Sequence, residues 1–254
     1  MLRRALRPRP RASSLPSAAL AAALLVPVGL LAGCSGDQGA GSNSEADADD
    51  DGEATPEEVL ALAKTTLDDT SGVQLSLTTD NLPDGTTGIT SATGVATAAP
   101  AFEGEIAVSL AGNSVEVPVV AVGGEVFAEL PLVPGFQTID PGEYGAPDPA
   151  ELIDPELGVS TLLTATEEPT EGETVRGGAD NSEVLTEYSG TVTDEVMTNV
   201  IPSAEGDFDV VYTITEDGEL RSAELTGVFY PDSAEMTYTV DLTDYGTEQD
   251  ITAP

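Results

Sequence analysis

The sequence predicts an α+β domain in which helices lie against the concave face of one curved antiparallel sheet. Three observations lead to this fold class. A capped helix opens the ordered part of the chain, apolar residues then alternate with polar ones in two groups of strands, and short helical segments separate the two groups.

The first 33 residues have the layout of an export signal. Residues 1–11 (MLRRALRPRPR) contain five arginines and no acid, and residues 18–33 (AALAAALLVPVGLLAG) are uncharged and almost wholly apolar. A helix over this apolar run would span about 24 Å, less than the ~30 Å hydrocarbon core of a bilayer, and Pro27 and Gly29 interrupt it. We predict that residues 1–33 are a lipoprotein signal peptide, with a permanent transmembrane anchor as the weaker alternative.

Cys34 is the only cysteine of the chain and follows the apolar run directly. The sequence Leu31-Ala32-Gly33-Cys34 fits the bacterial lipobox, in which small residues before the cysteine admit the signal peptidase. This predicts cleavage before Cys34 and a thioether from its sulfur to diacylglycerol, so that the protein is lipid-anchored on the extracytoplasmic face of the cell membrane. The alternative is an ordinary secretory signal that leaves an unpaired thiol.

Residues 34–54 comprise the lipidated cysteine and an acidic linker. The stretch 35–54 (SGDQGAGSNSEADADDDGEA) has no apolar residue larger than alanine, so it cannot bury enough surface to order itself. As a coil it spans roughly 25 Å. Asp47, Asp49, Asp51 and Gly52, with Glu58 six residues on, match the EF-hand pattern, but no helix precedes them. We predict no metal site, and calcium binding by this stretch stays open.

The ordered domain is predicted to cover residues 55–254, which is the length of one domain. Thr55-Pro56-Glu57-Glu58 reads as an N-cap, a proline at the first helical position and a capping-box glutamate. The helix that follows is predicted to run to about Asp69, with Leu60, Ala63 and Leu67 on one face.

After this helix the apolar period becomes two, which is typical of strands with one buried face. The alternating sets are Val73, Leu75 and Leu77; Ile106, Val108 and Leu110; Val115, Val117, Val119 and Ala121; Val126, Ala128 and Leu130; Phe208, Val210, Tyr212 and Ile214; a strand through Leu220 to Tyr230; and Met236, Tyr238, Val240 and Leu242. Gly123-Gly124 and Asp217-Gly218 supply hairpin turns. Residues 148–166 read as helical turns, and residues 193–201 as a short helix capped by Thr193 or Asp194.

The charge of the chain limits its partners. All 46 acids follow Cys34, and only Lys64, Arg176 and Arg221 remain as cations there, which leaves the mature chain at −43. Such a surface is repelled by phosphate, so we expect no nucleic-acid partner, and it is repelled by anionic headgroups, so membrane attachment has to come from acyl chains. Screening by salt would relieve the self-repulsion, which predicts a salt-adapted host.

The residue types present exclude most catalytic sites. With no histidine and no cysteine beyond Cys34, the chain cannot form a Ser-His-Asp triad, a Cys-His pair or an ordinary zinc site, and it has no P-loop. Paired carboxylates of a glycoside hydrolase remain an alternative, although acids are so abundant that no pair stands out. We expect no enzyme activity, no catalytic residue and no cofactor.

The apolar concave face of the predicted sheet has two interpretations. It is either sealed core between sheet and helices or the wall of a pocket for an apolar ligand. The strands place mostly valine, alanine and threonine inward, and the chain has only 6 tyrosines and 5 phenylalanines, so little side-chain volume is available to fill the space.

Several short motifs, in order, resemble the LppX/LprAFG family of actinobacterial lipoproteins. They are Leu82-Pro83, Gly88-Ile89, Ser91-Ala92-Thr93-Gly94, Pro100-Ala101-Phe102 with Gly104, Val117-Pro118-Val119-Val120, Thr138-Ile139-Asp140, Tyr144-Gly145-Ala146-Pro147-Asp148-Pro149, Leu162-Leu163-Thr164-Ala165, Ile201-Pro202-Ser203-Ala204, and Asp244-Tyr245-Gly246 with Asp250-Ile251-Thr252-Ala253-Pro254. The resemblance extends from the capped helix to the C-terminus and includes the lipobox.

The resemblance implies a half-barrel similar to the LolA/LolB carriers, with a cavity that takes the acyl chains of lipids or glycolipids and carries them across the cell envelope. It implies that the strand of Ile106, Val108 and Leu110 lines this cavity and that the segment of Leu162 and Leu163 covers it. The surface is more acidic than we expect of the family, so no headgroup preference is carried over.

Thirteen residues on the concave side are the expected lipid-binding residues: Leu75, Leu77, Ile106, Val108, Leu110, Val117, Val119, Val126, Leu130, Leu162, Leu163, Val196 and Ile201. The expected partners are an acylated lipid or glycolipid and, through the anchor, the cell membrane, with an inner-membrane lipid exporter as a further candidate. The alternative is a non-catalytic envelope scaffold or partner-binding lipoprotein with a filled core.

Overall fold

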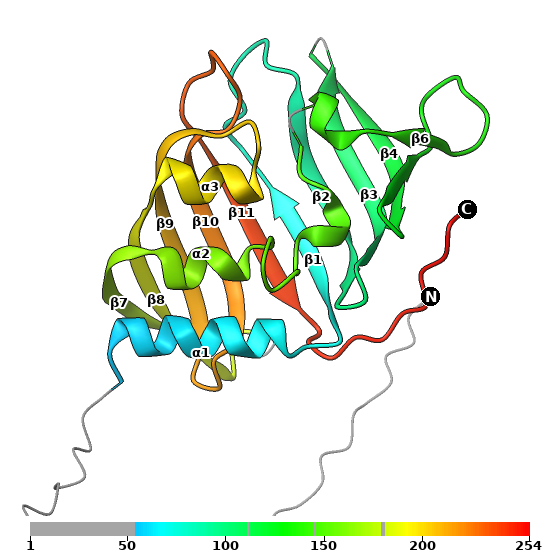
Figure 1. Ribbon diagram of the computed structural model, residues 1–254. Helices are drawn as coiled ribbons and strands as arrows, with labels where there is room; N and C mark the ends of the chain where they lie inside the picture. Colours follow the sequence, from blue (N-terminus) through cyan, green and yellow to red (C-terminus); the bar gives the residue numbers. More distant parts are fainter. Residues whose placement is uncertain (1–53, 111, 145, 179–180) are drawn as a thin grey trace, which may run out of the picture. The chain divides into compact units, whose positions relative to one another are not determined.

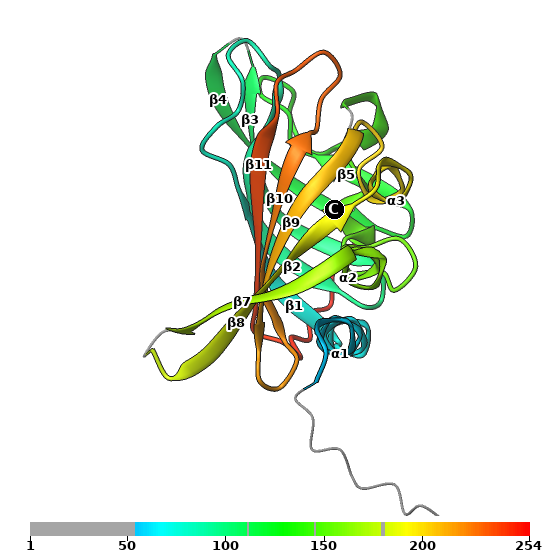
Figure 2. The same cartoon turned by 90° about the vertical axis from the view of Figure 1, so that its left-hand side faces the viewer.

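The computed structural model describes residues 54–110, 112–144, 146–178 and 181–254. They form an α+β domain around an antiparallel sheet of 11 strands, which is curved and does not close into a barrel (Figure 1). The helices lie on one face of this sheet, as the side view in Figure 2 shows. The predicted fold class is therefore confirmed. The signal peptide, Cys34 and the linker up to residue 53 lie outside the described residues.

The sheet is built from two halves that meet at its centre. The strands are β1 (Gly72–Thr78), β2 (Gly88–Thr97), β3 (Ala101–Leu110), β4 (Asn113–Val122), β5 (Glu125–Ala128), β6 (Gln137–Ile139), β7 (Glu167–Gly177), β8 (Glu183–Val192), β9 (Glu205–Thr215), β10 (Leu220–Val228) and β11 (Met236–Thr243). Their order is β6-β5-β4-β3-β2-β1-β11-β10-β9-β8-β7. The pairing of the first strand with the last, with Leu75 opposite Leu242, joins the halves.

The helical elements are α1 (Pro56–Asp68), the 3₁₀ turns η1 (Pro141–Tyr144) and η2 (Pro149–Glu151), α2 (Ser160–Ala165) and α3 (Asp194–Val200). The predicted capping box of α1 is confirmed. The Thr55 hydroxyl accepts a hydrogen bond from the Glu58 amide at 3.3 Å, and the Glu58 carboxylate accepts one from the Thr55 amide at 2.8 Å. The EF-hand match thus loses the free carboxylate of Glu58, while its acids at 47–51 lie outside the described residues.

The predicted apolar face of α1 is also confirmed. Leu60, Ala63 and Leu67 are buried in the main core. On the same helix Lys64 donates to Asp68 at 2.8 Å and to Ser160 at 3.3 Å. These contacts hold α1 against the start of α2. In the part of the chain that the structure describes, no helix is long and apolar enough to cross a bilayer.

The two halves of the concave face are filled differently. Over β8–β11, the helices α1, α2 and α3 pack onto a dense core that contains Phe208, Tyr212 and Ile214, and the rings of Phe208 and Phe229 meet edge to face at 4.9 Å. Over β1–β5, only the segment that contains η1 and η2 crosses the sheet (Figure 1). The cavity described below lies beneath this segment.

A pair of glycines lets one aromatic ring pack closely against the backbone of β2 and β3. Gly94 in β2 is opposite Gly104 in β3. A Cβ at Gly94 would lie 2.6 Å from the ring of Phe102, and a Cβ at Gly104 would lie 2.1 Å from the carbonyl oxygen of Thr93. Because neither position carries a side chain, the Phe102 ring packs directly on the backbone.

Four strands were not predicted. β2 is rich in glycine, serine and threonine, β6 has three residues, and β7 is an exposed edge strand (EEPTEGETVRG) without apolar alternation, paired with the unpredicted β8. Charged residues and a proline are usual on an edge, where they prevent pairing with another chain. The prediction of helical turns throughout residues 148–166 was too broad, because only η2 and α2 are helical there. The strand expected through Tyr230 ends at Val228, and Thr193 occupies the N-cap of α3 without a side-chain bond.

Candidate lipid-binding cavity

An apolar cavity of about 560 Å³ lies between the concave side of β1–β5 and the segment that contains η1 and η2. This volume is within the usual range for small-molecule sites, roughly 300–1,000 Å³. Strand side chains from β3, β4 and β5 form most of one wall, and Leu225, Tyr238 and Val240 of β10 and β11 extend it across the centre of the sheet. Among the described residues that line it, Glu143 is the only charged one.

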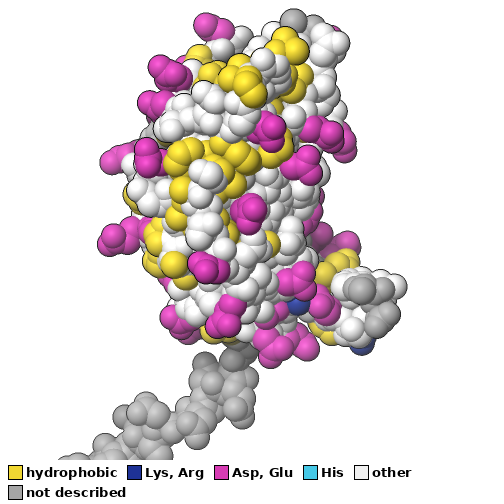
Figure 3. Space-filling model, turned by 90° about the vertical axis from the view of Figure 1, so that its right-hand side faces the viewer, with side chains coloured by type: hydrophobic (Ala, Val, Ile, Leu, Met, Phe, Trp, Pro, Cys, Tyr) yellow, Lys and Arg dark blue, Asp and Glu magenta, His cyan; other side chains and the backbone are white. Residues whose placement is uncertain are grey.

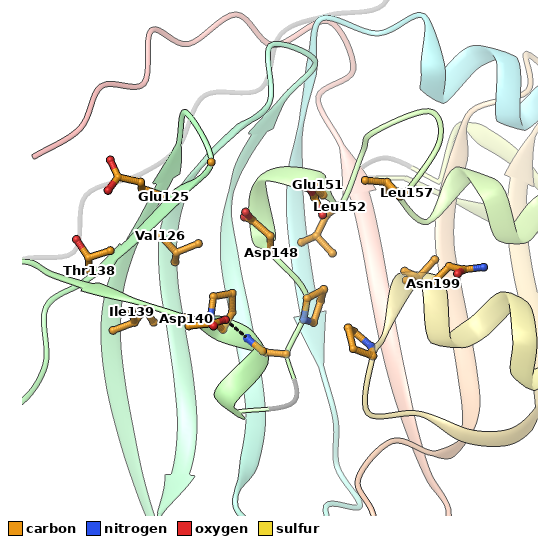
Figure 4. A pocket seen from close by; sticks show the side chains of 17 residues that line it. Glu125, Val126, Thr138, Ile139, Asp140, Asp148, Glu151, Leu152, Leu157 and Asn199 are labelled. Carbon is orange, nitrogen blue, oxygen red and sulfur yellow. Dashed lines mark hydrogen bonds between the residues drawn. The ribbon is translucent and has the colours of Figure 1, made fainter.

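The cover of the cavity is rich in proline. Pro141, Pro147 and Pro149 line it together with Ala146 and Leu152. Proline has a fixed φ angle and no amide donor, so this segment can cross an apolar surface without many unpaired backbone groups. Local bonds stabilise its turns: the Asp140 carboxylate accepts from the Gly142 amide at 2.9 Å (dashed in Figure 4), and the Asp148 carboxylate accepts from the Ala150 amide at 2.9 Å.

Ten of the thirteen expected lipid-binding residues line this cavity. They are Leu75, Leu77, Ile106, Val108, Leu110, Val117, Val119, Val126, Leu130 and Ile201. They come from β1, β3, β4 and β5, from the residues just after β5, and from the end of α3. The structure therefore brings the alternating apolar positions of separate strands to one space, and their contact with lipid stays a prediction.

The other three expected residues lie elsewhere. Leu162 and Leu163 are buried in the packed core under α2, and Val196 of α3 is partly buried against the same core. The resemblance implied that the helical segment of Leu162 and Leu163 covers the cavity, and in the structure this segment covers the packed core. Because α1 and α3 flank α2 over β8–β11, the space beneath α2 is filled, and the segment 139–152 covers the cavity instead.

The residues that sequence reasoning missed are mainly aromatic and proline side chains. Phe102, Phe229, Tyr230 and Tyr238 line the cavity, as do the prolines of the cover. The run of four prolines between 141 and 155 was a usable signal, because a proline-rich segment that carries apolar residues suits an irregular cover better than a helix. Tyr238 was among the predicted alternating positions of its strand, but its place in the cavity wall, like that of Tyr230, depends on the pairing of β10 with β11 and had no local signal.

Two tyrosines provide the main hydrogen-bonded polar group of the cavity. β1 stops pairing with β2 at Thr78, opposite Ser91, so Ile89 of β2 has no strand partner on that side. Its amide donates to the Tyr230 hydroxyl at 3.0 Å, the two tyrosine hydroxyls are 2.8 Å apart, and the Tyr238 hydroxyl donates to the Ile89 carbonyl. Burial, and then the neighbouring Tyr230, raise the pKa of Tyr238 well above its ordinary value. Tyr238 therefore stays neutral at physiological pH.

A second pocket of about 450 Å³ adjoins the first and is more polar. It lies beside β5, β6 and the end of α3, and Glu125, Asp140, Asp148, Glu151 and Asn199 are among its lining residues (Figure 4). Burial, followed by the charges of Asp148 and Asp154, raises the pKa of Glu151. No group of acids among the described residues has the arrangement of a metal site. Ile139, Pro141 and Leu152 are among the residues that line both this pocket and the cavity.

The cations of the domain lie away from the cavity. Lys64 pairs with Asp68, and Arg221 pairs with Glu183 and Glu219, each at 2.8–2.9 Å. Neither these residues nor Arg176 line the cavity. The described cavity wall thus offers hydroxyl groups and one carboxylate to a bound headgroup, and no positive charge.

Comparison with known proteins supports the fold. The model of the LppX_LprAFG lipoprotein family matches residues 55–253. The structure is similar to LprF from Mycobacterium bovis, with a TM-score of 0.63 and 16% identity over 78% of this chain and 96% of that one. It is also similar to lipoprotein LppX from Mycobacterium tuberculosis, with a TM-score of 0.56 and 16% identity over 78% and 98%.

Two further comparisons say nothing more about the fold or the function. A LolA superfamily protein from Nitrosomonas europaea aligns at 10% identity over 79% of this chain and 96% of that one, but the TM-score is only 0.27. The predicted likeness to the LolA/LolB carriers therefore stays a prediction. Curated protein sequences give no significant match.

Proposed function

The chain belongs to the LppX_LprAFG lipoprotein family, and on that premise we propose that it binds acylated lipids or glycolipids in the apolar cavity and carries them across the cell envelope. Acyl chains on Cys34 would hold it at the extracytoplasmic face of the cell membrane during this work. The observation that carries the proposal is the cavity itself, an apolar space of about 560 Å³ with a single charged residue in its described wall.

The hydrophobic effect is sufficient for such binding without a catalytic group. Each buried CH₂ contributes about 0.8 kcal/mol, so ten carbons of one acyl chain contribute roughly 8 kcal/mol before the entropic cost of association is subtracted. Polar groups then select the headgroup. The hydroxyl protons of Tyr230, Tyr238 and Ser203 are already donated within the domain, so these groups offer only acceptor oxygens, which suit the hydroxyl groups of a headgroup. A phosphate would meet Glu143 and no cation. The cavity therefore suits an uncharged headgroup, such as that of a neutral glycolipid.

Two isoleucine substitutions test the proposal against a filled core. Ile106 lines the cavity, whereas Ile214 is 1% exposed in the packed core. Ile106→Trp should fill the cavity and abolish lipid transfer from donor vesicles while the melting temperature stays near that of the parent. Ile214→Trp should lower stability by about 1–3 kcal/mol, as overpacking does.

The outcome separates a lipid carrier from a scaffold. If Ile106→Trp destabilises the domain as much as Ile214→Trp and the parent transfers no lipid, the interior is filled and the protein is an envelope scaffold. Donor vesicles that offer a neutral or an anionic lipid with the same acyl chains test the headgroup preference separately.

A further inference from the structure

A strained, fully exposed leucine stands beside the cavity. The Val133 amide donates to the Leu130 carbonyl at 3.2 Å, which closes a four-residue turn with Pro131 and Leu132 at its centre. Leu132 has a φ of 69° and is 105% exposed. Proline followed by a residue with positive φ is the pattern of a type II turn, in which glycine or asparagine is usual at that position. A bulky residue there costs free energy in the backbone and exposes apolar surface to water.

The turn is continuous with the cavity. Leu130 and Pro131 line the cavity, and Leu132 follows them directly. Leu110 and Tyr144 also line it, yet they are 45% and 64% exposed. Residues that both line a cavity and face water mark the place where it opens. We define the apolar rim as Leu110, Pro131, Leu132, Val133 and Tyr144.

The turn of the rim, Pro131 to Val133, lies in an uncharged stretch of this acidic chain, whereas Tyr144 of the rim follows Glu143. No charged residue occurs between Glu129 and Asp140, whereas the loops 79–87 and 229–235, which also border the cavity, carry two acids each. In Figure 1 the loop next to β6 projects from the sheet, and Figure 3 shows that side of the molecule, where hydrophobic side chains gather in patches bordered by acids. An uncharged lipid surface could approach the domain here without electrostatic repulsion.

We propose that the apolar rim inserts Leu132 into the surface of an uncharged or zwitterionic bilayer, so that an acyl chain passes from the membrane into the cavity without crossing water. This inference rests on the proposed function. The twenty residues between Cys34 and Thr55 could extend to about 70 Å, long enough for a tethered domain to turn its rim to the membrane. Tethering raises the effective concentration of the rim at the bilayer, so a weak, reversible contact is enough.

The substitution Leu132→Gly distinguishes membrane insertion by this residue from a role in the stability of the fold. In the mature chain with Cys34→Ala, which lacks the anchor, Leu132→Gly should leave the melting temperature unchanged or raise it, because glycine accepts a positive φ. The same change should weaken partitioning onto phosphatidylcholine vesicles about ten- to hundredfold, since it removes one inserted leucine. The matched control is Val175→Thr, which alters a 41% exposed apolar residue on β7 and should bind vesicles as the parent does.

Uptake of a fluorescent diacylglycerol from the same vesicles provides the second readout. Leu132→Gly should slow uptake by a similar factor and reach the same final level, because the cavity is unchanged. Unaltered vesicle binding by Leu132→Gly, an equal loss with Val175→Thr, or a parent that does not bind vesicles would each overturn the inference; the last result would favour a protein partner for the rim. A parent that never takes up lipid would instead defeat the proposed function.

Discussion

The hydroxyl of Tyr230 lies 2.8 Å from the hydroxyl of Tyr238, and the pair replaces a missing strand partner of Ile89 at the wall of the cavity. One tyrosine follows β10 and the other lies in β11, whereas Ile89 belongs to β2 on the far side of β1. The tyrosines therefore hydrogen-bond the two halves of the sheet to each other beyond the point where β1 stops pairing with β2. Their only polar atoms are used in this ring of hydrogen bonds, and their rings face the cavity.

Tyr238→Phe should destabilise the domain. It leaves the part-buried carbonyl of Ile89 without its tyrosine donor. An unsatisfied buried group costs about 1–3 kcal/mol, and we expect a part-buried one near the lower end of this range. Urea unfolding of the parent and the variant measures this difference. Tyr144→Phe, at a residue that is 64% exposed, is the matched control and should change the free energy of unfolding by less than about 0.5 kcal/mol. Equal stability of all three proteins would show that the ring contributes nothing.

Stability should fall at alkaline pH because buried tyrosines resist ionisation. Burial raises the pKa of Tyr212 well above the ordinary value of about 10, although its hydrogen bond with Thr166 opposes the shift. The native state keeps this proton where the unfolded chain releases it, so the stabilisation is complete below about pH 10 and is lost as the pH rises further. Each such tyrosine should lower the free energy of unfolding by up to about 1.4 kcal/mol per pH unit.

Tyr212→Phe isolates one tyrosine of this alkaline dependence. Loss of the Tyr212 hydroxyl leaves Thr166 with a hydrogen-bond partner, because the Thr166 hydroxyl donates to the Leu162 carbonyl at 2.8 Å. The free energy of unfolding, measured between about pH 9 and about pH 11, should fall less steeply in the variant than in the parent. Identical slopes would mean that Tyr212 ionises as readily in the folded protein as in the unfolded chain.

Salt should stabilise the domain strongly. The mature chain has 46 acids and three cations, and the self-repulsion that results is screened as the Debye length falls from about 10 Å at ~0.1 M salt to about 3 Å at ~1 M. Urea unfolding in sodium chloride should therefore show a free energy of unfolding that rises over this range. The double variant Glu171→Gln, Glu173→Gln, on exposed positions of β7, should rise less. A stability that stays flat or falls contradicts the salt-adapted account.

Cys34→Ala should release the protein from the membrane without loss of lipid binding. Its surface charge does not attract it to anionic lipid, so the acyl chains on Cys34 would be its main attachment. Fractionation of the host should find the parent in washed membranes and the variant in the soluble fraction. Ser35→Ala, next to the lipobox cysteine, serves as the control and should stay in the membranes. Retention of Cys34→Ala in washed membranes would contradict lipidation as the anchor.

Local features of this fold could be read from the sequence, and features that depend on distant pairing could not. The capping box of Thr55 and Glu58 involves residues three positions apart, and the alternation in β9 reports one buried face, so both predictions were confirmed. β7 was missed because an exposed edge strand needs no apolar alternation. The ladder between β1 and β11 joins residues some 165 positions apart, and nothing local indicates it.

The same limit applies to the cavity. Ile106 and Leu162 are both apolar residues at regular spacing, yet one lines an open space and the other is packed beneath α2. The difference arises because different segments cross the two halves of the sheet. Three helices cover β8–β11, and the proline-rich segment that contains η1 and η2 covers β1–β5. Period and composition identify the inward face of a strand, but they do not say what lies opposite.

Native mass spectrometry of the mature chain purified from its own host tests lipid binding most directly. We expect the folded protein to carry an additional mass that denaturation releases and that lipid extraction identifies as an acylated lipid with an uncharged headgroup. Ile106→Trp, purified in the same way, should be folded and lack this mass. A folded parent without any releasable lipid, or a variant that keeps the same lipid, would contradict the account of the cavity as the binding site.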